Sequence, residues 1–170
     1  MLQFTKDLLQ NSDIDSGSVR VGVLSYSTKV TVHFQLKDYS TKAEVFDAIN
    51  NIPYMFGSTN TAEAITTMRQ EMFTIGNGDR SDVKNVAIII TDGVSNINSR
   101  STVPEAERAR DEDGIHIYTI GIGLSDVREL NSMASVPAED NSFSVQSFDE
   151  LVGLDQKIFS SICPGKELVL

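Results

Sequence analysis

Apolar residues along the chain gather in short runs that alternate with segments of helical periodicity. Residues 19–25 (VRVGVLS), 85–91 (NVAIIIT) and 115–122 (IHIYTIGI) are such runs. The last two are nearly continuous and rich in β-branched residues, which is typical of parallel strands covered by helices on both faces. We therefore predict that residues 85–91 and 115–122 form the centre of a sheet.

Residues 30–36 show a different pattern, because apolar and polar side chains alternate there. A period of two indicates a strand with one exposed face. We expect this strand at an edge of the sheet. The alternating residues are Val30, Thr31, Val32, His33, Phe34, Gln35 and Leu36.

Three hydroxyl residues are each followed, three positions later, by a glutamate, which is the spacing of a helix capping box. The predicted helix starts are Thr41 with Glu44, Thr102 with Glu105, and Ser147 with Glu150. Apolar stripes at helical spacing follow Thr61 and Ser147, and we predict that they belong to the core. The stripe residues are Ile65, Met68, Met72 and Ile75, and then Phe148, Leu151, Val152, Ile158, Phe159 and Ile162.

The alternation of strands and helices predicts an α/β fold, a Rossmann-like three-layer sandwich with helices on both faces of a mostly parallel sheet and one antiparallel edge strand. With 170 residues, 40% of them hydrophobic, the chain suits a single domain. No linker or repeat divides it. Residues 164–170 are expected to be a short C-terminal tail.

The charge of the chain excludes one class of partner. Lys+Arg 14 against Asp+Glu 24 gives a net charge of −10. No dense basic cluster interrupts this acidic balance, so nucleic acid is not expected as a partner. No apolar run approaches the roughly 20 residues of a membrane-spanning helix, and residues 1–7 do not have the regions of a signal peptide.

Two polar segments lie where a parallel sheet places its ligands, at the carboxyl ends of the strands. Asp92 comes directly after the run 85–91, and the loop Gly57-Ser-Thr-Asn-Thr61 precedes a predicted helix. Taken singly, an Asp-Gly pair is a common turn, and Thr or Asn before a helix is a common cap. Only the combination of the two segments indicates a binding site.

In combination, these segments resemble the von Willebrand factor A family, in which a Gly-x-Thr-x-Thr loop and a Thr-Asp-Gly turn form part of a metal-ion-dependent adhesion site. Thr59 precedes Asp92 by 33 positions, which is similar to the family spacing. The resemblance covers nearly the whole chain and is nearest to the matrix-type domains of matrilins and collagens. Further matching segments are residues 19–26, 118–123, 130–137 and 148–151.

The resemblance implies an extracellular, non-enzymatic protein-binding module, with extracellular matrix proteins such as collagens as partners. In the intact family site, Thr59 would bind Mg²⁺, or Mn²⁺ or Ca²⁺, directly or through water, and Asp92 would neutralise the ion. Ser58 and Ser95 would lie nearby. Such an ion takes oxygen ligands and, with few carboxylates around it, accepts a carboxylate from a partner protein.

One part of the family pattern is not found. Family members begin with an apolar strand that ends in Asp-x-Ser-x-Ser, whereas Met1 falls inside the helix that follows. The resemblance therefore implies a domain over residues 1–163 that is incomplete at its N-terminus, with the first central strand missing and metal binding weak or absent. The literal Asp140-Asn-Ser-Phe-Ser144 is interpreted as unrelated to the site, because no apolar strand precedes it.

The cysteine and the two histidines of the chain give weaker indications of function. By resemblance, the single cysteine, Cys163, would pair with a cysteine upstream of this chain, while a free thiol stays open as the alternative. His33 and His116 are isolated and are interpreted as structural.

Two other functions stay open. One is a structural or assembly module with a vestigial metal site. The other is an enzyme that transfers phosphate through Asp92, which would need a lysine and a second acidic pocket. Gly121-Ile-Gly123 follows a strand but is not followed by the third glycine of a dinucleotide site.

Overall fold

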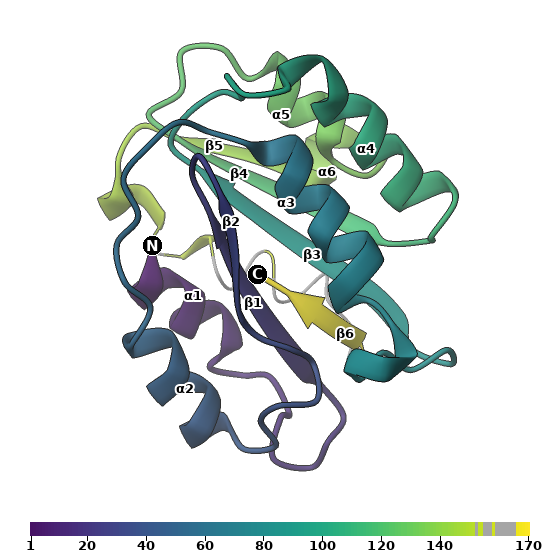
Figure 1. Ribbon diagram of the computed structural model, residues 1–170. Helices are drawn as coiled ribbons and strands as arrows, with labels where there is room; N and C mark the ends of the chain where they lie inside the picture. The colour runs from purple at the N-terminus through teal and green to yellow at the C-terminus, as the bar shows by residue number, and fades with distance from the viewer. Residues whose placement is uncertain (152, 155–157, 159–165) are drawn as a thin grey trace.

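The computed structural model describes residues 1–151, 153, 154, 158 and 166–170, and these residues form a three-layer α/β sandwich (Figure 1). The six strands of its sheet lie in the order β2-β1-β6-β3-β4-β5. Only β2 runs antiparallel to its neighbour. The predicted fold class is confirmed. The strands are β1 (Arg20–Tyr26), β2 (Val30–Phe34), β3 (Lys84–Thr91), β4 (His116–Ile122), β5 (Ser142–Val145) and β6 (Lys166–Val169).

The strands predicted from the sequence are all present. β3 and β4 pair in parallel from Val86 with His116 to Thr91 with Gly121. β2 lies at one edge of the sheet and β5 at the other. The apolar residues of β3 and β4 are buried against helices on both faces, as their continuous apolar pattern predicts.

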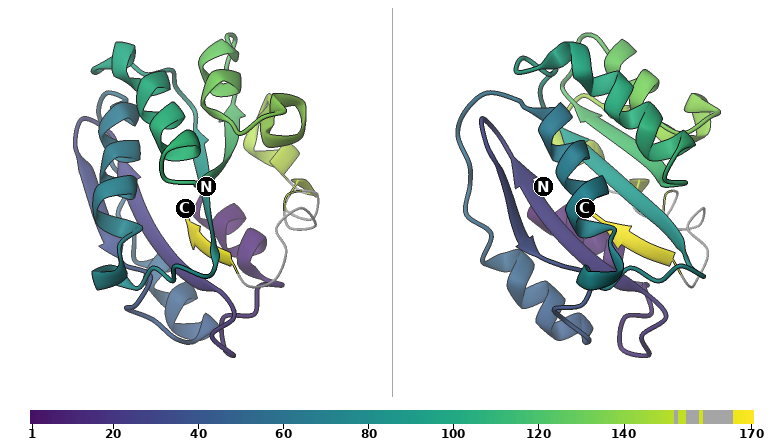
Figure 2. Two further views of the ribbon diagram at one scale, coloured as in Figure 1. Left: turned by 90° about the vertical axis from the view of Figure 1, so that its right-hand side faces the viewer. Right: turned by 45° about the vertical axis from the view of Figure 1, so that its right-hand side comes forward.

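Helices cover the two faces of the sheet (Figure 2). On one face, α1 (Leu2–Leu9) and α2 (Lys42–Asn50) pack against side chains such as Val23 and Ile88. On the other face, the core residues come from α3, α4 and α5 together with strand residues such as Ala87 and Ile89. These helices are α3 (Thr61–Thr67), α4 (Ser99–Asp111) and α5 (Arg128–Met133); the short α6 (Ala138–Asn141) precedes β5.

The first of the three predicted helix starts is confirmed. Thr41 caps α2 with a full capping box, in which its side chain accepts from the Glu44 amide and the Glu44 carboxylate accepts from the Thr41 amide. Ser147 precedes only a 3₁₀ turn, Phe148–Leu151, and most of the helix expected after it falls outside the described residues.

The second predicted start, at Thr102, is wrong. α4 begins at Ser99, so Thr102 lies inside the helix with its side chain fully buried. Its hydroxyl donates to the Ser95 hydroxyl at 3.0 Å and is therefore not used as a cap. A Ser/Thr-x-x-Glu spacing also occurs inside helices, and burial of the hydroxyl decided its role here.

The apolar stripe after Thr61 is confirmed in three of its four residues. Ile65, Met68 and Met72 are buried. After α3 the chain continues through a π-turn, Met68–Met72, and then a 3₁₀ turn, Ile75–Asn77. Because the helix has ended by that point, Ile75 leaves the stripe and is 80% exposed.

The C-terminal residues correct a further expectation. Lys166–Val169 do not form a tail but form β6, which lies between β1 and β3 and pairs in parallel with both (yellow in Figure 1). The backbones of two buried strands need hydrogen-bonding partners, and the backbone of this C-terminal segment supplies them over part of their length. The central position of the sheet is thus filled over part of its length. Cys163 lies outside the described residues, so its predicted pairing stays untested.

Candidate functional site at the carboxyl edge of the sheet

The structure brings together the two segments that the sequence singled out. Asp92 follows β3 directly and is exposed, and Thr59 lies in the loop before α3. A Cβ atom placed on Gly93 would lie 3.1 Å from the Thr59 hydroxyl oxygen. The Thr59 side chain therefore lies against the Asp92-Gly93 turn, at the edge where β1, β3 and β4 end. We refer to this edge as the carboxyl edge.

The loop of residues 57–60 is held from both sides. On one side, the Thr59 amide donates to the Asn96 side-chain oxygen at 2.8 Å, and the Asn96 amide donates to the Thr59 carbonyl at 3.0 Å. On the other side, the Ser58 amide donates to the Thr28 hydroxyl at 3.1 Å, and the Asn60 amide donates to the Ser27 carbonyl at 3.0 Å. The position of Thr59 is therefore fixed by the β1–β2 turn and by the turn after β3.

Ser95 lies near this edge, as expected, but its polar groups are engaged elsewhere. Its amide donates to the Glu129 carboxylate at 2.9 Å, and its hydroxyl accepts from Thr102 at 3.0 Å. The Ser95 residue is buried. These contacts join the turn after β3 to α4 and α5, which is a structural role for Ser95.

Tyr26, at the end of β1, is a residue of this edge that the sequence did not single out. Its hydroxyl donates to the Ile90 carbonyl at 3.4 Å. Burial raises the pKa of the Tyr26 phenol to about 12, hydrogen bonds with Thr91 and Thr61 act in the opposite direction, and the Asp92 charge adds to the rise. An aromatic residue near the end of a strand is usually core, so no sequence signal set Tyr26 apart.

The amino group of Met1 also lies close enough to Asp92 to interact with its charge. Burial lowers the pKa of this amino group, while the Asp92 carboxylate acts to raise it.

The donor atoms at the carboxyl edge fit a divalent cation only in part. Asp92 offers an exposed carboxylate and Thr59 a hydroxyl, and both are hard oxygen ligands of the kind that Mg²⁺ and Ca²⁺ take. Within the ranges that the structure describes, no three His, Cys, Asp or Glu side chains are grouped so as to hold a metal ion. Such an ion needs about six ligands, so the chain's own side chains supply a minority of them.

The other polar candidates lie apart from this edge. Asp140 lies in α6, just before β5 begins at Ser142, and so at the amino end of that strand. His33 shares a hydrogen bond of 2.7 Å with the Ser25 hydroxyl, and His116 shares one of 2.7 Å with the Asn141 side chain. Both histidines therefore have structural partners, in agreement with their interpretation. Among the described residues, no helix is long and apolar enough to span a membrane.

Comparisons with known proteins agree with this architecture. The chain is 30% identical to mouse collagen alpha-4(VI) chain over 96% of its own length and 7% of that protein, and 32% identical to mouse matrilin-3 over 98% of its length and 34% of that protein. The chain thus spans about a third or less of these relatives. They are proteins of the extracellular matrix, which confirms the extracellular location implied by the resemblance.

Solved structures and a family model complete the comparison. Proximal thread matrix protein 1 from the mussel byssus superposes with a TM-score of 0.86 at 25% identity, over 94% of this chain and 41% of that one. Another structure of that protein, with a zinc-occupied MIDAS motif, superposes with a TM-score of 0.84 at 29% identity, over 95% and 39% of the two chains. A model of the von Willebrand factor type A domain matches residues 1–157. The chain therefore belongs to the von Willebrand factor type A domain family.

Proposed function

We propose that the chain is a protein-binding module of the extracellular matrix whose partner docks at the carboxyl edge, around Thr59 and Asp92. The observation that supports this proposal is the contact between the Thr59 side chain and the Asp92-Gly93 turn. Two oxygen ligands from distant parts of the chain meet at an exposed edge. The same edge of a parallel sheet is where α/β domains bind their ligands.

A divalent cation would strengthen this docking by accepting a carboxylate from the partner, as hard cations with few protein carboxylates do. In this proposal the chain supplies two of the ligands of the cation, Thr59 and Asp92. Asp92 holds negative charge at the exposed turn, and the reciprocal hydrogen bonds with Asn96 hold the Thr59 backbone in place. The proposal includes Mg²⁺, Mn²⁺ or Ca²⁺ as the ion, with weak affinity because the described residues supply few ligands.

Matrix proteins such as collagens are the proposed partners, because the relatives named above are matrix proteins. That the chain is not an enzyme stays a prediction. The second candidate function is an assembly module that binds without metal, and the small number of ligands that the described residues supply favours it.

A binding experiment separates the two functions. Immobilised collagen would be titrated with the chain in Mg²⁺ and again in EDTA, with Asp92→Asn and Thr59→Ala as test variants. Asp140→Asn is the matched control, because Asp140 is also exposed but lies at the amino end of β5. We expect Mg²⁺-dependent binding that weakens at least about tenfold in both test variants and is unchanged in the control.

Two results of this experiment would contradict the proposal. Collagen binding that is as strong in EDTA, and in Asp92→Asn, as it is for the parent chain in Mg²⁺ would reject the cation and favour the assembly module. The absence of collagen binding in any condition, together with no heat of Mg²⁺ binding in calorimetry, would reject docking at Thr59 and Asp92.

A further inference from the structure

The turn after β3, residues 92–97, is fixed near both of its ends. At its start, the Thr91 hydroxyl donates to the Gly93 carbonyl at 2.7 Å and accepts from the Gly93 amide at 3.2 Å. Near its end, the Asn96 amide donates to the Thr59 carbonyl at 3.0 Å. The position of one end relative to the other therefore depends on what holds the middle of the turn.

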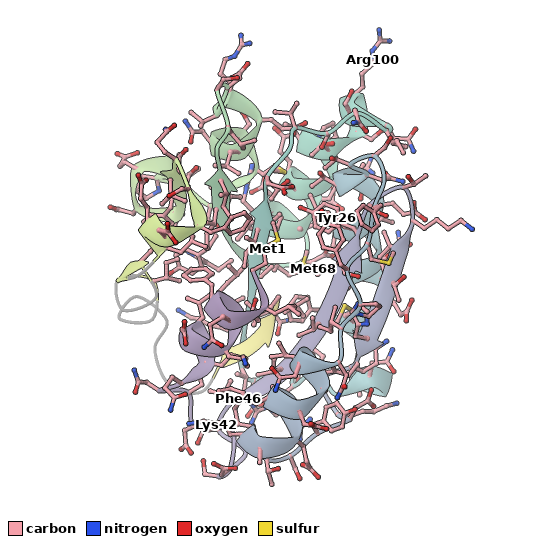
Figure 3. The ribbon with its side chains drawn as sticks, turned by 90° about the vertical axis from the view of Figure 1, so that its left-hand side faces the viewer. Met1, Tyr26, Lys42, Phe46, Met68 and Arg100 are labelled. Atoms are coloured by element: carbon pink, nitrogen blue, oxygen red, sulfur yellow. The ribbon has the colours of Figure 1, made fainter. Side chains whose placement is uncertain are left out.

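The middle of the turn is held by the two helices beside it, through Ser95. The Ser95 amide donates to the Glu129 carboxylate of α5 at 2.9 Å, and the Ser95 hydroxyl accepts from Thr102 of α4 at 3.0 Å. A bond to a charged acceptor is roughly twice as strong as one between neutral groups. Arg100, two residues before Thr102, is exposed and points away from the sheet (Figure 3). Glu129 therefore makes the stronger of these two bonds to Ser95.

α5 is a firm support for the Glu129 carboxylate. Leu130 and Met133 of α5 are 2% and 1% exposed and belong to the core between the helices and the sheet. At the end of α5, the Arg110 guanidinium donates to three successive carbonyls at 2.8, 2.6 and 2.9 Å. Because α5 is fixed by its apolar face and by its end, Glu129 determines where Ser95 lies.

The Glu129 carboxylate lies close to the candidate site. Burial is the main cause that raises the pKa of the Tyr26 phenol to about 12, and the charges of Asp92 and Glu129 both add to the rise. Tyr26 is at the end of β1, on the carboxyl edge (Figure 3). Both carboxylates are thus near the same hydroxyl, and a shift of the turn at Ser95 would take place beside Asp92.

We propose that Glu129 is a positioning residue of the candidate site, which fixes Ser95 and, through Ser95, the adjoining Asn96. Because Asn96 binds the Thr59 backbone at both its donor and its acceptor, the carboxylate acts on Thr59 from α5. Without this carboxylate, the partly buried Ser95 amide would have no acceptor, and the turn would shift to find another one. Glu129 itself offers no ligand to a cation and no contact to a partner in this proposal.

Two variants of Glu129 test this role without any ligand. Glu129→Ala removes the acceptor, whereas Glu129→Gln keeps an oxygen acceptor and removes only the charge. Amide hydrogen exchange would be compared at Thr59 and at Ile120, a fully buried residue of β4 that reports the stability of the whole fold. We expect Glu129→Ala to speed exchange at Thr59 at least about fivefold more than at Ile120, and Glu129→Gln to restore most of the protection at Thr59. If Glu129→Ala does not fold, Glu129→Asp, which draws the carboxylate back from Ser95, takes its place.

Glu150→Ala is the matched control, because the Glu150 carboxylate also accepts from a backbone amide, that of Gln146, at 2.8 Å. This bond lies after β5, at the far side of the sheet, so its loss should leave exchange at Thr59 unchanged. Unchanged exchange at Thr59 in Glu129→Ala, equal acceleration at Thr59 and Ile120, or the same effect in Glu150→Ala would each overturn the proposal.

A second measurement tests the effect on binding, and this step rests on the proposed function. With immobilised collagen in Mg²⁺, Glu129→Ala should bind about tenfold more weakly than the parent chain, and Glu129→Gln should bind nearly as well as the parent. Faster exchange at Thr59 together with unchanged collagen binding would overturn the link between Glu129 and the site. If the parent chain itself did not bind collagen, the proposed function would fail, whereas the exchange at Thr59 would still decide whether Glu129 positions the turn.

Discussion

Thr59 and Asn96 hold each other by two reciprocal hydrogen bonds, from the Thr59 amide to the Asn96 side chain at 2.8 Å and from the Asn96 amide to the Thr59 carbonyl at 3.0 Å. The loop before α3 and the turn after β3 are 37 residues apart in sequence. Because the Thr59 backbone is bound at both its donor and its acceptor, the residue is held beside the Asp92-Gly93 turn. The geometry of the candidate site thus depends on a residue, Asn96, that offers no ligand in our proposal.

Asn96→Ala should therefore loosen Thr59 more than it destabilises the fold. The variant removes one exposed side-chain hydrogen bond, so we expect a loss of about 0.5–1 kcal/mol in the free energy of unfolding. Amide exchange at Thr59 should become faster, because this amide loses its acceptor. Asn131→Ala removes a comparable bond to Ser142 and should leave exchange at Thr59 unchanged. Unchanged exchange at Thr59 in Asn96→Ala would contradict the role given to Asn96.

Gly57→Ala should disturb the other side of the same loop. Gly57 has a φ of +144°, which L residues rarely adopt, and a Cβ there would lie 2.5 Å from the Thr28 hydroxyl. Backbone strain and this clash should cost about 1–3 kcal/mol of stability in chemical denaturation. Gly76→Ala is the matched control, since nothing lies within 4 Å of a Cβ at that position, and its change should stay within about 0.5 kcal/mol. Equal stabilities of the two variants would show that the loop is free to move away from Thr28.

The sequence predicted Thr59 and Asp92 because strand exits and loop motifs are local patterns. Asp92 follows a buried apolar run that is recognisable without any structure. Tyr26 could not be found in the same way, because its place beside Thr91 and Asp92 arises from the alignment of β1 with β3 across the sheet. Neighbours across a sheet are set by strand order, which no short motif encodes.

The C-terminal strand was missed for a related reason. Residues 166–170 are few, and a short segment with two charged and three apolar residues after the last predicted helix is equally compatible with a tail. The segment forms a strand because it pairs with β1 and β3. This pairing is a long-range feature that the local sequence does not show. Thr102 was misassigned because its capping spacing is local, whereas its burial against Ser95 is tertiary.

Tyr26 should make stability fall at high pH. Its folded-state pKa of about 12 lies above its ordinary value of 10.0, so folding favours the neutral phenol. This contribution is fully present below about pH 10 and is lost as the pH rises toward 12, because the unfolded chain ionises first. The free energy of unfolding, measured by urea denaturation across this range, should decline less in Tyr26→Phe. Tyr54→Phe, which alters a 77% exposed tyrosine, should follow the parent chain. A parallel decline in all three proteins would show that Tyr26 ionises as a free phenol does.

Arg69 should be the charged residue whose loss costs most among those in described ion pairs. Its guanidinium lies 2.7 Å from Glu105 and 2.5 Å from Asp113, and the Arg69 and Glu105 side chains are only 10% and 13% exposed. Arg69→Met keeps the aliphatic packing but leaves the Glu105 carboxylate in a poorly solvated place with Arg108 as its remaining partner. Since the Arg108 side chain is 52% exposed, it offsets the Glu105 charge incompletely, and we expect the free energy of unfolding in urea to fall by about 2 kcal/mol.

This loss of stability should persist in high salt, because partly buried pairs are screened less than surface pairs. Arg128→Met is the matched control: the Arg128 side chain is 90% exposed beside Asp126, so its removal should change stability little. If the two variants were equally stable, the Arg69 cluster would behave as a surface network, and its ion pairs would contribute little to holding the turn Met68–Met72 against α4.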